Sequence, residues 1–136
     1  MNNGRFAIAL HILTLLEKAK GELLSSEYLA GSININPVLV RKELSNLRNC
    51  GFVTTKEGKG GGSTLARAAK DISLGAIYES VKQVSLLGHQ KNTPNPKCPV
   101  GKDINKHLDN LYNDTEKVLI AQLSKQTLAD FSHQFK

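Results

Sequence analysis

The segment Asn34-Ile35-Asn36-Pro37 constrains the fold of this chain more than any other stretch. Asn36 is a good helix N-cap, and Pro37 suits the first helical position, because the N–H that proline lacks would have no helical partner there. The sequence therefore predicts a helix from Pro37 to about Asn49. Three apolar residues, spaced four and then three apart, are expected to face inward from it: Val40, Leu44 and Leu47.

A shorter helix is predicted just before this turn. Ser25-Ser26-Glu27 places a hydroxyl N-cap ahead of an acid in the first turn, and apolar residues continue to Ile33. Upstream, the amphipathic run 5–18 predicts a buried first helix. Two short helices joined by a tight turn are typical of a helix-turn-helix.

A glycine-rich stretch follows. Residues 58–62 hold four glycines and Lys59, and they lie between two predicted strands, 52–55 and 63–66. A mononucleotide-binding loop would need Lys and then Ser or Thr after its last glycine, and a helix beyond; here Ser63 follows Gly62 and a strand is expected. A hairpin tip without a role is a second interpretation. The third interpretation, which the upstream helices favour, is a wing whose own backbone approaches the sugar–phosphate backbone of a nucleic acid.

Charge is concentrated in the same region. The chain carries a formal net charge of +6, and residues 34–67 hold six basic and two acidic residues, which accounts for +4 of it. An excess of this size favours an anionic partner without proving one. The outward face of the helix that begins at Pro37 is polar and basic, and Val38, Lys42, Ser45 and Asn49 are the residues predicted on it.

The second half of the chain predicts more helices. One is expected over 74–84, then a loop over 85–97, then a long helix from Pro99 to about Lys125 and a short one over 127–131. Some 25 residues make a rod of about 37 Å, which usually packs against another helix. Its own copy in a two-fold dimer is the simplest partner. The residues predicted at that interface are Ile104, Leu108, Leu111 and Val118.

These elements predict a mainly α-helical protein with a small β-wing. The expected organisation is a winged helix-turn-helix DNA-binding domain over 1–84, a loop over 85–97, and a long dimerisation helix with a short C-terminal helix over 98–136. No apolar run approaches the roughly 20 residues that cross a bilayer, and the first residues do not resemble a signal peptide. We therefore expect a soluble cytoplasmic protein without a membrane partner.

Several stretches resemble the Rrf-type family of winged-helix transcription regulators. They are GRFAIALHIL, SSEYLAGSININPVLVRKELSNLRNCGFV, GGGSTLARAAKDISLGAIYESV and KCPVG, and NPKCPVGK is similar to a cluster-free, Firmicute-type branch. The resemblance covers nearly the whole chain. It implies a homodimer without enzymatic activity. This homodimer is expected to bind a partly palindromic operator on double-stranded DNA and, by family habit, to repress transcription.

The family's base contacts map onto the start of the helix that begins at Pro37. Lysine can donate to guanine and valine can meet a thymine methyl, although many relatives carry polar residues at 38 and 39. A family wing residue near the minor groove corresponds to Lys59, and serines at a helix N-terminus suit a phosphate. The predicted DNA-binding residues are Ser25, Ser26, Asn36, Val38, Leu39, Arg41, Lys42, Ser45 and Lys59.

No metal or other cofactor is expected. Family members that bind an iron–sulfur cluster use three cysteines spaced C-x5-C-x5-C before the long helix, and Cys98 matches the last of them. The other two positions hold Leu86 and Asn92, and one thiolate per chain cannot hold a cluster. His89 and His107 with Cys98 match no known zinc spacing, so unrelated surface residues are the favoured interpretation.

Cys98 has two interpretations. At a helix start, with Lys97 and Lys102 beside it, its thiol pKa should fall, which suits a redox or electrophile sensor; an inert capping cysteine is the alternative. Cys50 is a small residue where a helix meets the wing, and its side chain is expected to be buried. A small-molecule effector is also compatible with the loop over 85–97.

Three classes of function remain open from the sequence. The first is a DNA-binding regulator. The second is an enzyme with Cys98 as nucleophile, which would need a base that no motif places. The third is a protein-interaction module of winged fold, which the basic helix and glycine-rich wing disfavour. We expect the first, and no enzymatic activity.

Overall fold

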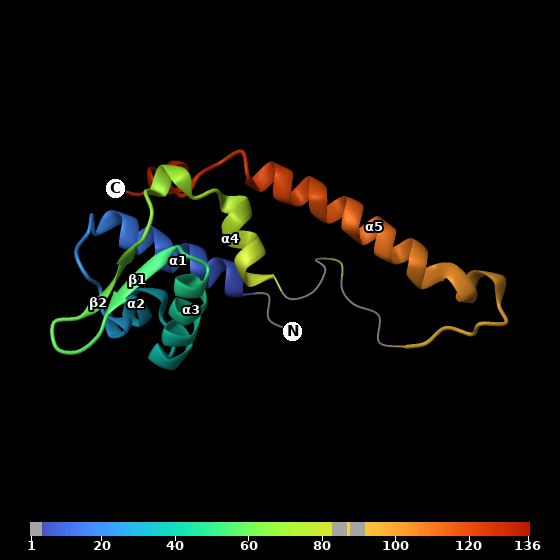
Figure 1. Cartoon of the computed structure of the whole chain (residues 1–136), viewed down its shortest axis with the longest axis horizontal. Coiled ribbons are helices and arrows are strands. Elements are labelled where there is room, and N and C mark those ends of the chain that lie inside the picture. The colour runs from blue at the N-terminus through green and yellow to red at the C-terminus, as the bar shows by residue number, and fades with distance from the viewer. Residues whose placement is uncertain (1–3, 83–86, 88–91) are drawn as a thin grey trace.

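The computed structural model describes residues 4–82, 87 and 92–136 of the chain (Figure 1). It is mostly helical with one two-stranded antiparallel sheet, which confirms the predicted fold class. The elements in chain order are α1 (Arg5–Lys18), α2 (Ser26–Ile33), α3 (Pro37–Asn49), β1 (Val53–Lys56), β2 (Gly62–Leu65), the 3-10 turn η1 (Ala69–Asp71), α4 (Leu74–Val81), α5 (Pro99–Leu123) and α6 (Leu128–Ser132).

The turn between α2 and α3 forms as its residues predict. Asn34 ends α2 in the left-handed conformation at φ 64°, which asparagine tolerates better than most residues. The Oδ1 atom of Asn36 accepts a hydrogen bond from the backbone N–H of Val38 at 2.8 Å, and Pro37 occupies the first turn. The predicted helix-turn-helix start at Pro37 is therefore confirmed.

The wing is a hairpin with a glycine tip. Strands β1 and β2 pair antiparallel from Val53 opposite Leu65 to Lys56 opposite Gly62. A Cβ atom on Gly61 would lie 2.1 Å from the carbonyl oxygen of Lys56, so the turn closes around a position that admits no side chain. Beside its glycine tip, strand β2 is bonded to the segment before α2, since the backbones of Leu24 and Ser63 exchange hydrogen bonds of 3.0 and 2.9 Å.

One hydrophobic core holds the helix-turn-helix, and α6 belongs to it. The inward residues predicted on α3 are buried, with Val40 and Leu47 at 0% exposure. Leu128 of α6 is also at 0%, and its N–H donates to the carbonyl of Ile72 at 2.7 Å. The chain end thus returns to the core formed by α1, although it follows the long helix. The proposed boundary at residue 98 stays a prediction.

Helix α5 extends away from this core (Figure 1). Near its C-terminal end it packs on α4 at Gly75, where an added Cβ would lie 3.0 Å from the carbonyl oxygen of Ile120. Glu116 accepts a hydrogen bond from the Tyr78 hydroxyl at 2.8 Å and lies 3.7 Å from the ammonium of Lys82. These contacts attach one end of α5 to the winged domain and leave its other end projecting.

Several predicted boundaries differ from the structure. The strands predicted over 52–55 and 63–66 lie at Val53–Lys56 and Gly62–Leu65, and the short helix predicted over 127–131 lies at Leu128–Ser132. The long helix ends at Leu123 rather than near Lys125. Helix α4 ends at Val81, while the last two residues of the predicted span 74–84 lie outside the described residues, as does most of the predicted loop over 85–97. No helix of the described residues is long and apolar enough to span a bilayer.

Candidate nucleic-acid interface

The start of α3 presents its side chains to solvent. Burial of Val40, Leu44 and Leu47 on one side turns the opposite side outward. There Val38 is 58% exposed and Leu39 is 51% exposed, a large apolar exposure for a soluble helix. Arg41 and Lys42 are exposed on the same turn, Asn36 is exposed at the cap, and Ser45 is half-buried one turn further on.

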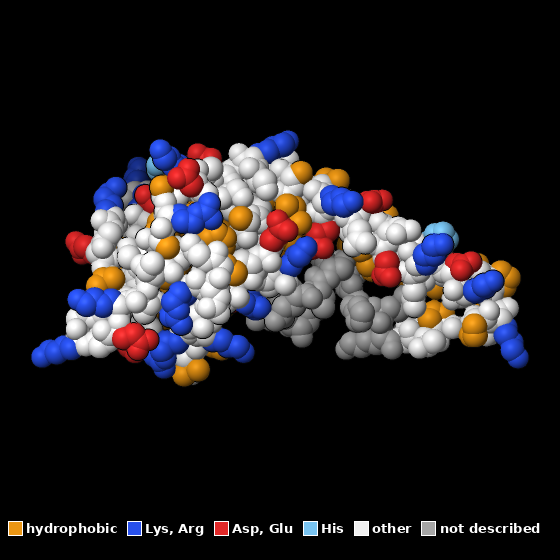
Figure 2. All heavy atoms as spheres, viewed as in Figure 1, with side chains coloured by type: hydrophobic (Ala, Val, Ile, Leu, Met, Phe, Trp, Pro, Cys, Tyr) orange, Lys and Arg blue, Asp and Glu red, His pale blue; other side chains and the backbone are white. Residues whose placement is uncertain are grey.

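The wing and α3 form one basic surface. Figure 2 shows Lys and Arg side chains gathered over α3 and the wing, at the lower left of the view. Lys59 is exposed at the wing tip between Gly58 and Gly60, which both have positive φ values, 89° and 74°. Glycine adopts this conformation without steric cost, so the tip can bring its backbone close to a partner.

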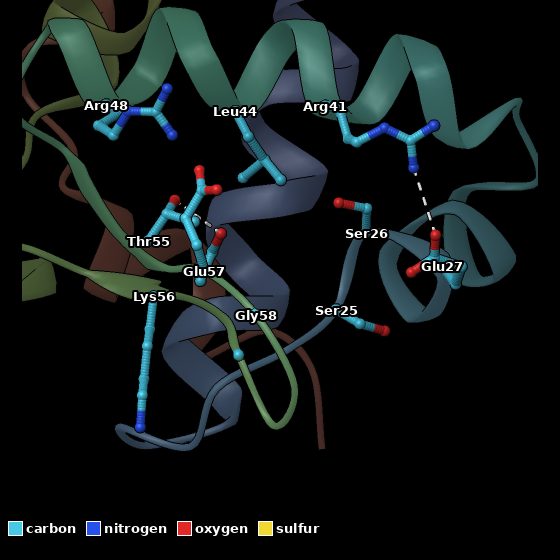
Figure 3. Close-up of a pocket in the computed structure, with 13 residues that line it drawn as sticks. Ser25, Ser26, Glu27, Arg41, Leu44, Arg48, Thr55, Lys56, Glu57 and Gly58 are labelled. Carbon is cyan, nitrogen blue, oxygen red and sulfur yellow. Dashed lines mark hydrogen bonds and ion pairs between the residues drawn. The ribbon is translucent and has the colours of Figure 1, made fainter.

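A hollow of about 430 Å³ separates α3 from the wing and the start of α2 (Figure 3). Arg41 and Arg48 lie along its α3 side, and Ser26 points into it from the first turn of α2. Glu57 reaches into it from the wing, whereas the Lys56 side chain points away. The hollow brings arginines, a hydroxyl and the N-terminus of α2 together, which suits an anion such as phosphate. Glu27 and Glu57 also line it, and their carboxylates oppose an anion.

The two serines play different local roles. The Oγ atom of Ser25 is the N-cap of α2 and accepts a hydrogen bond from the N–H of Tyr28 at 3.0 Å. Its own hydrogen stays available to donate to an anion, because a hydroxyl has one donor besides its lone pairs. Ser26 is the first residue of the helix and is half-buried.

Acidic side chains also touch this surface. The Arg41 guanidinium lies 3.3 Å from the carboxylate of Glu27, and their side chains are 51% and 71% exposed. Exposed pairs of this kind contribute about 0–1 kcal/mol, so a DNA phosphate can replace the carboxylate at small cost.

Sequence reasoning missed the polar contacts on the inner side of α3. Glu43 is 6% exposed, and Arg5 donates to its two carboxylate oxygens at 2.9 and 3.2 Å. Asn46 is half-buried and donates from Nδ2 to Glu43 at 3.1 Å and to the carbonyl oxygen of Ser80 at 2.9 Å. The signal was the i, i+3 spacing of Glu43 and Asn46 on an otherwise basic helix.

Cys98 caps α5 with its sulfur. The Sγ atom accepts a hydrogen bond from the N–H of Gly101 at 3.4 Å, and the side chain is exposed. Backbone hydrogen bonds from Gly101 and then Val100 lower the pKa of the Cys98 thiol, as expected at a helix start.

Cys50 is not buried, so that prediction was wrong. The side chain is exposed. Helix α3 ends at Asn49, and Gly51 turns the chain away at φ 83°, which leaves Cys50 outside the core.

The donor set does not fit a metal centre. Within residues 4–82, 87 and 92–136, no group of three or more His, Cys, Asp or Glu side chains could hold a metal ion. Cys98 is the one thiol at the position that matches a cluster ligand, and its sulfur already caps a helix. His89, considered for zinc, lies outside the described residues.

The predicted dimer residues line one side of α5. Leu111 is 55% exposed and Val118 is 70% exposed, while Ile104 and Leu108 are half-buried. At 100° per residue, Glu116 and Ile120, which touch α4, lie on a different side of the helix. The seam is therefore separate from the surface that attaches α5 to its own domain.

Comparison with known proteins agrees with this architecture. Residues 2–134 match the family model Rrf2, described as an iron-dependent transcriptional regulator. The chain is 38% identical over 136 residues to "Putative HTH-type transcriptional regulator YwnA" of Bacillus subtilis (strain 168), covering 99% of this chain and all of that one.

Solved structures share the fold. A Lactobacillus plantarum structure is 28% identical with a TM-score of 0.79, over 96% of this chain and 88% of that chain. CymR of B. subtilis, named the global cysteine regulator, is 21% identical with a TM-score of 0.72, over all of this chain and 98% of that chain. At that identity the likeness to CymR shows the fold alone.

Proposed function

Since the chain belongs to the Rrf2 family of transcriptional regulators, we propose that it is a homodimeric repressor that binds a partly palindromic operator on double-stranded DNA. The observation that carries this proposal is the joint exposure of the α3 start and the glycine wing on one basic surface. It acts in the cytoplasm and has no enzymatic activity of its own.

In the proposed complex, α3 enters the major groove. Lys42 and Arg41 donate to guanine, and the exposed methyl groups of Val38 meet thymine. Leu39, Ser45 and Asn36 lie within the same footprint. Lys59 reaches the neighbouring minor groove with the wing tip, and Ser25 and Ser26 hold a backbone phosphate at the hollow beside α2.

The dimer is proposed to form through α5. Ile104, Leu108, Leu111 and Val118 repeat at spacings of four, three and seven, which is a heptad-like seam. Exposed apolar residues along a projecting helix are costly in water, and a second copy of α5 would cover them. A two-fold pair would present two α3 helices, which is why the operator should be partly palindromic.

Iron is not assigned a role. The family description names iron dependence, but this chain offers one thiol where a cluster needs several. The proposed function therefore assigns no step to an iron–sulfur cluster.

A thiol signal at Cys98 is the second candidate, favoured by an exposed sulfur whose thiolate is stabilised by two backbone N–H groups. A hydroperoxide would be reduced as the thiolate attacks its O–O bond, giving a sulfenic acid and an alcohol or water.

The test is selection of bound sequences from a random duplex pool by the purified full chain, with and without a mild hydroperoxide. Recovery of a partly palindromic site establishes the regulator. Loss of that site on oxidation, but not in Cys98→Ser, establishes the thiol switch. Absence of any enriched site at low salt contradicts the proposal of sequence-specific DNA binding. It favours a protein-interaction module of the same fold.

A further inference from the structure

Helix α3, the proposed DNA-reading helix, carries a charged residue on its buried side. Glu43 is 6% exposed, whereas the other buried residues of α3, Val40, Leu44 and Leu47, are apolar. A buried carboxylate is costly unless it is paired and hydrogen-bonded. Replacement by an apolar residue would often be no less stable, so the group's contribution is better sought in geometry than in stability.

Three hydrogen bonds fix the direction of that carboxylate. The Arg5 Nε atom donates to Oε1 at 2.9 Å and its Nη2 atom to Oε2 at 3.2 Å, a two-point contact from the first turn of α1. Asn46 donates to Oε2 at 3.1 Å from one turn further along α3. Apolar packing resists separation but is non-directional, whereas a two-point ion pair also resists rotation.

The same network reaches α4. Asn46 Nδ2 also donates to the carbonyl oxygen of Ser80 at 2.9 Å. Two residues away on either side, Tyr78 and Lys82 hold Glu116 of α5. These hydrogen bonds constrain the rotation of α3 relative to two neighbouring elements, α1 and α4. Through α4 they also connect α3 to the long helix α5.

Rotation of α3 matters for base recognition. Side-chain ends lie about 5–6 Å from a helix axis, so a turn of about 20° moves them by about 2 Å. Hydrogen bonds to base edges require donor–acceptor distances within a few tenths of an ångström of about 3 Å. Phosphate contacts from long lysine and arginine side chains tolerate such a shift better, because those side chains are flexible.

We propose that Glu43, held by Arg5 and Asn46, is a positioning residue that fixes the rotation of α3 and so sets sequence discrimination rather than general affinity for DNA. This proposal rests on the proposed function, since it needs α3 to read bases. Glu43 itself faces the core and touches no DNA.

The test uses the full-length double variant Arg5→Leu/Glu43→Leu. It removes one positive and one negative charge, so the net charge stays at +6 and the electrostatic attraction to DNA is matched to wild type. Dissociation constants are measured for the selected operator and for a scrambled duplex across a salt series. The specificity ratio should fall about tenfold or more, while scrambled-duplex affinity and its salt slope stay the same.

Two further variants separate positioning from simple destabilisation. Ile72→Val alters a fully buried residue beside α6 that takes no part in the hydrogen bonds of Glu43, and it should lower thermal stability while keeping the specificity ratio. Glu43→Gln keeps the side-chain size and one acceptor for Arg5, so its ratio should lie between wild type and the double variant; it also serves if the double variant fails to fold.

The outcomes are distinct. A folded double variant, or Glu43→Gln, with an unchanged specificity ratio overturns the positioning role. An equal loss of ratio in Ile72→Val overturns it too, because stability alone would then explain the effect. If the wild-type chain selects no operator, the proposed function itself has failed, and the ratio has no reference.

Discussion

Arg41 of α3 and Glu27 of α2 form an ion pair at 3.3 Å on the proposed DNA-binding surface. The pair engages the Arg41 guanidinium, which the proposed DNA complex would use. Glu27 also places a negative charge on the surface where DNA phosphates are proposed to bind. In the proposed complex, DNA would have to displace this contact of the free protein. Its exposure means that salt and phosphate both weaken it.

Glu27→Gln should bind DNA more tightly. Loss of the carboxylate frees Arg41 and removes repulsion, which we expect to raise affinity by about three- to tenfold at low salt and less at high salt. Fluorescence anisotropy with a labelled duplex measures this. Asp109→Asn on α5 is exposed and changes net charge equally, so an equal gain there would mean that net charge alone is responsible.

Lys42→Ala and Lys59→Ala should fail in different ways. Lys42 is proposed to contact a base, so its loss should cost about 1–3 kcal/mol on the operator and relax selectivity at one position. Lys59 is placed at a wing tip, so its loss should weaken all duplexes alike and lower the salt slope by about 1. Selection profiles and salt titrations distinguish the two, and identical profiles would contradict the assignment.

Gly61→Ala should disrupt the wing. Its Cβ would lie 2.1 Å from the Lys56 carbonyl oxygen, and backbone cannot move aside cheaply. We expect about tenfold weaker DNA binding with little loss of helix content by circular dichroism. Gly60→Asn is the matched control, because position 60 has open space and a φ of 74° that asparagine tolerates. Equal effects from both variants would argue against a specific wing geometry.

Val118→Glu should convert the proposed dimer to a monomer. The side chain is 70% exposed in one chain, so the change costs little until a second α5 covers it. Sedimentation velocity measures the mass. Asn113→Glu adds the same charge on the opposite side of α5 and should leave the dimer intact. A monomeric wild type would remove the basis of this prediction.

Tyr78 should make stability fall at high pH. Burial, followed by its hydrogen bond to Glu116 and the charge of Glu116, raises the pKa of Tyr78 to about 12. The protonated phenol is thus favoured by folding. Its contribution is complete below the ordinary tyrosine pKa of about 10 and is lost as pH rises towards 12.

Urea midpoints of the wild type and Tyr78→Phe measure that loss. The difference between them should shrink between pH 10 and 12 and should be constant from pH 7 to 9. A difference that does not change with pH would mean that the phenol is not held protonated by Glu116 and its surroundings.

Local chemistry in the sequence determined much of this protein. The cap at Asn36, the proline at 37 and the apolar spacing on α3 each act over one or two turns, so they could be predicted without a structure. The glycine wing and the N-cap at Cys98 are equally local. The outward residues of α3 could also be predicted, because the helical spacing of the apolar residues identified the inward side.

Contacts between distant segments were decided by the tertiary structure alone. Arg5 and Glu43 are 38 residues apart, and nothing in either neighbourhood marks them as partners. Leu128 enters the core of α1 after a helix that projects away from it, and Cys50 lies outside that core because of how the chain leaves α3 at Gly51. Periodicity states which side of a helix is buried, but only packing decides what meets it there.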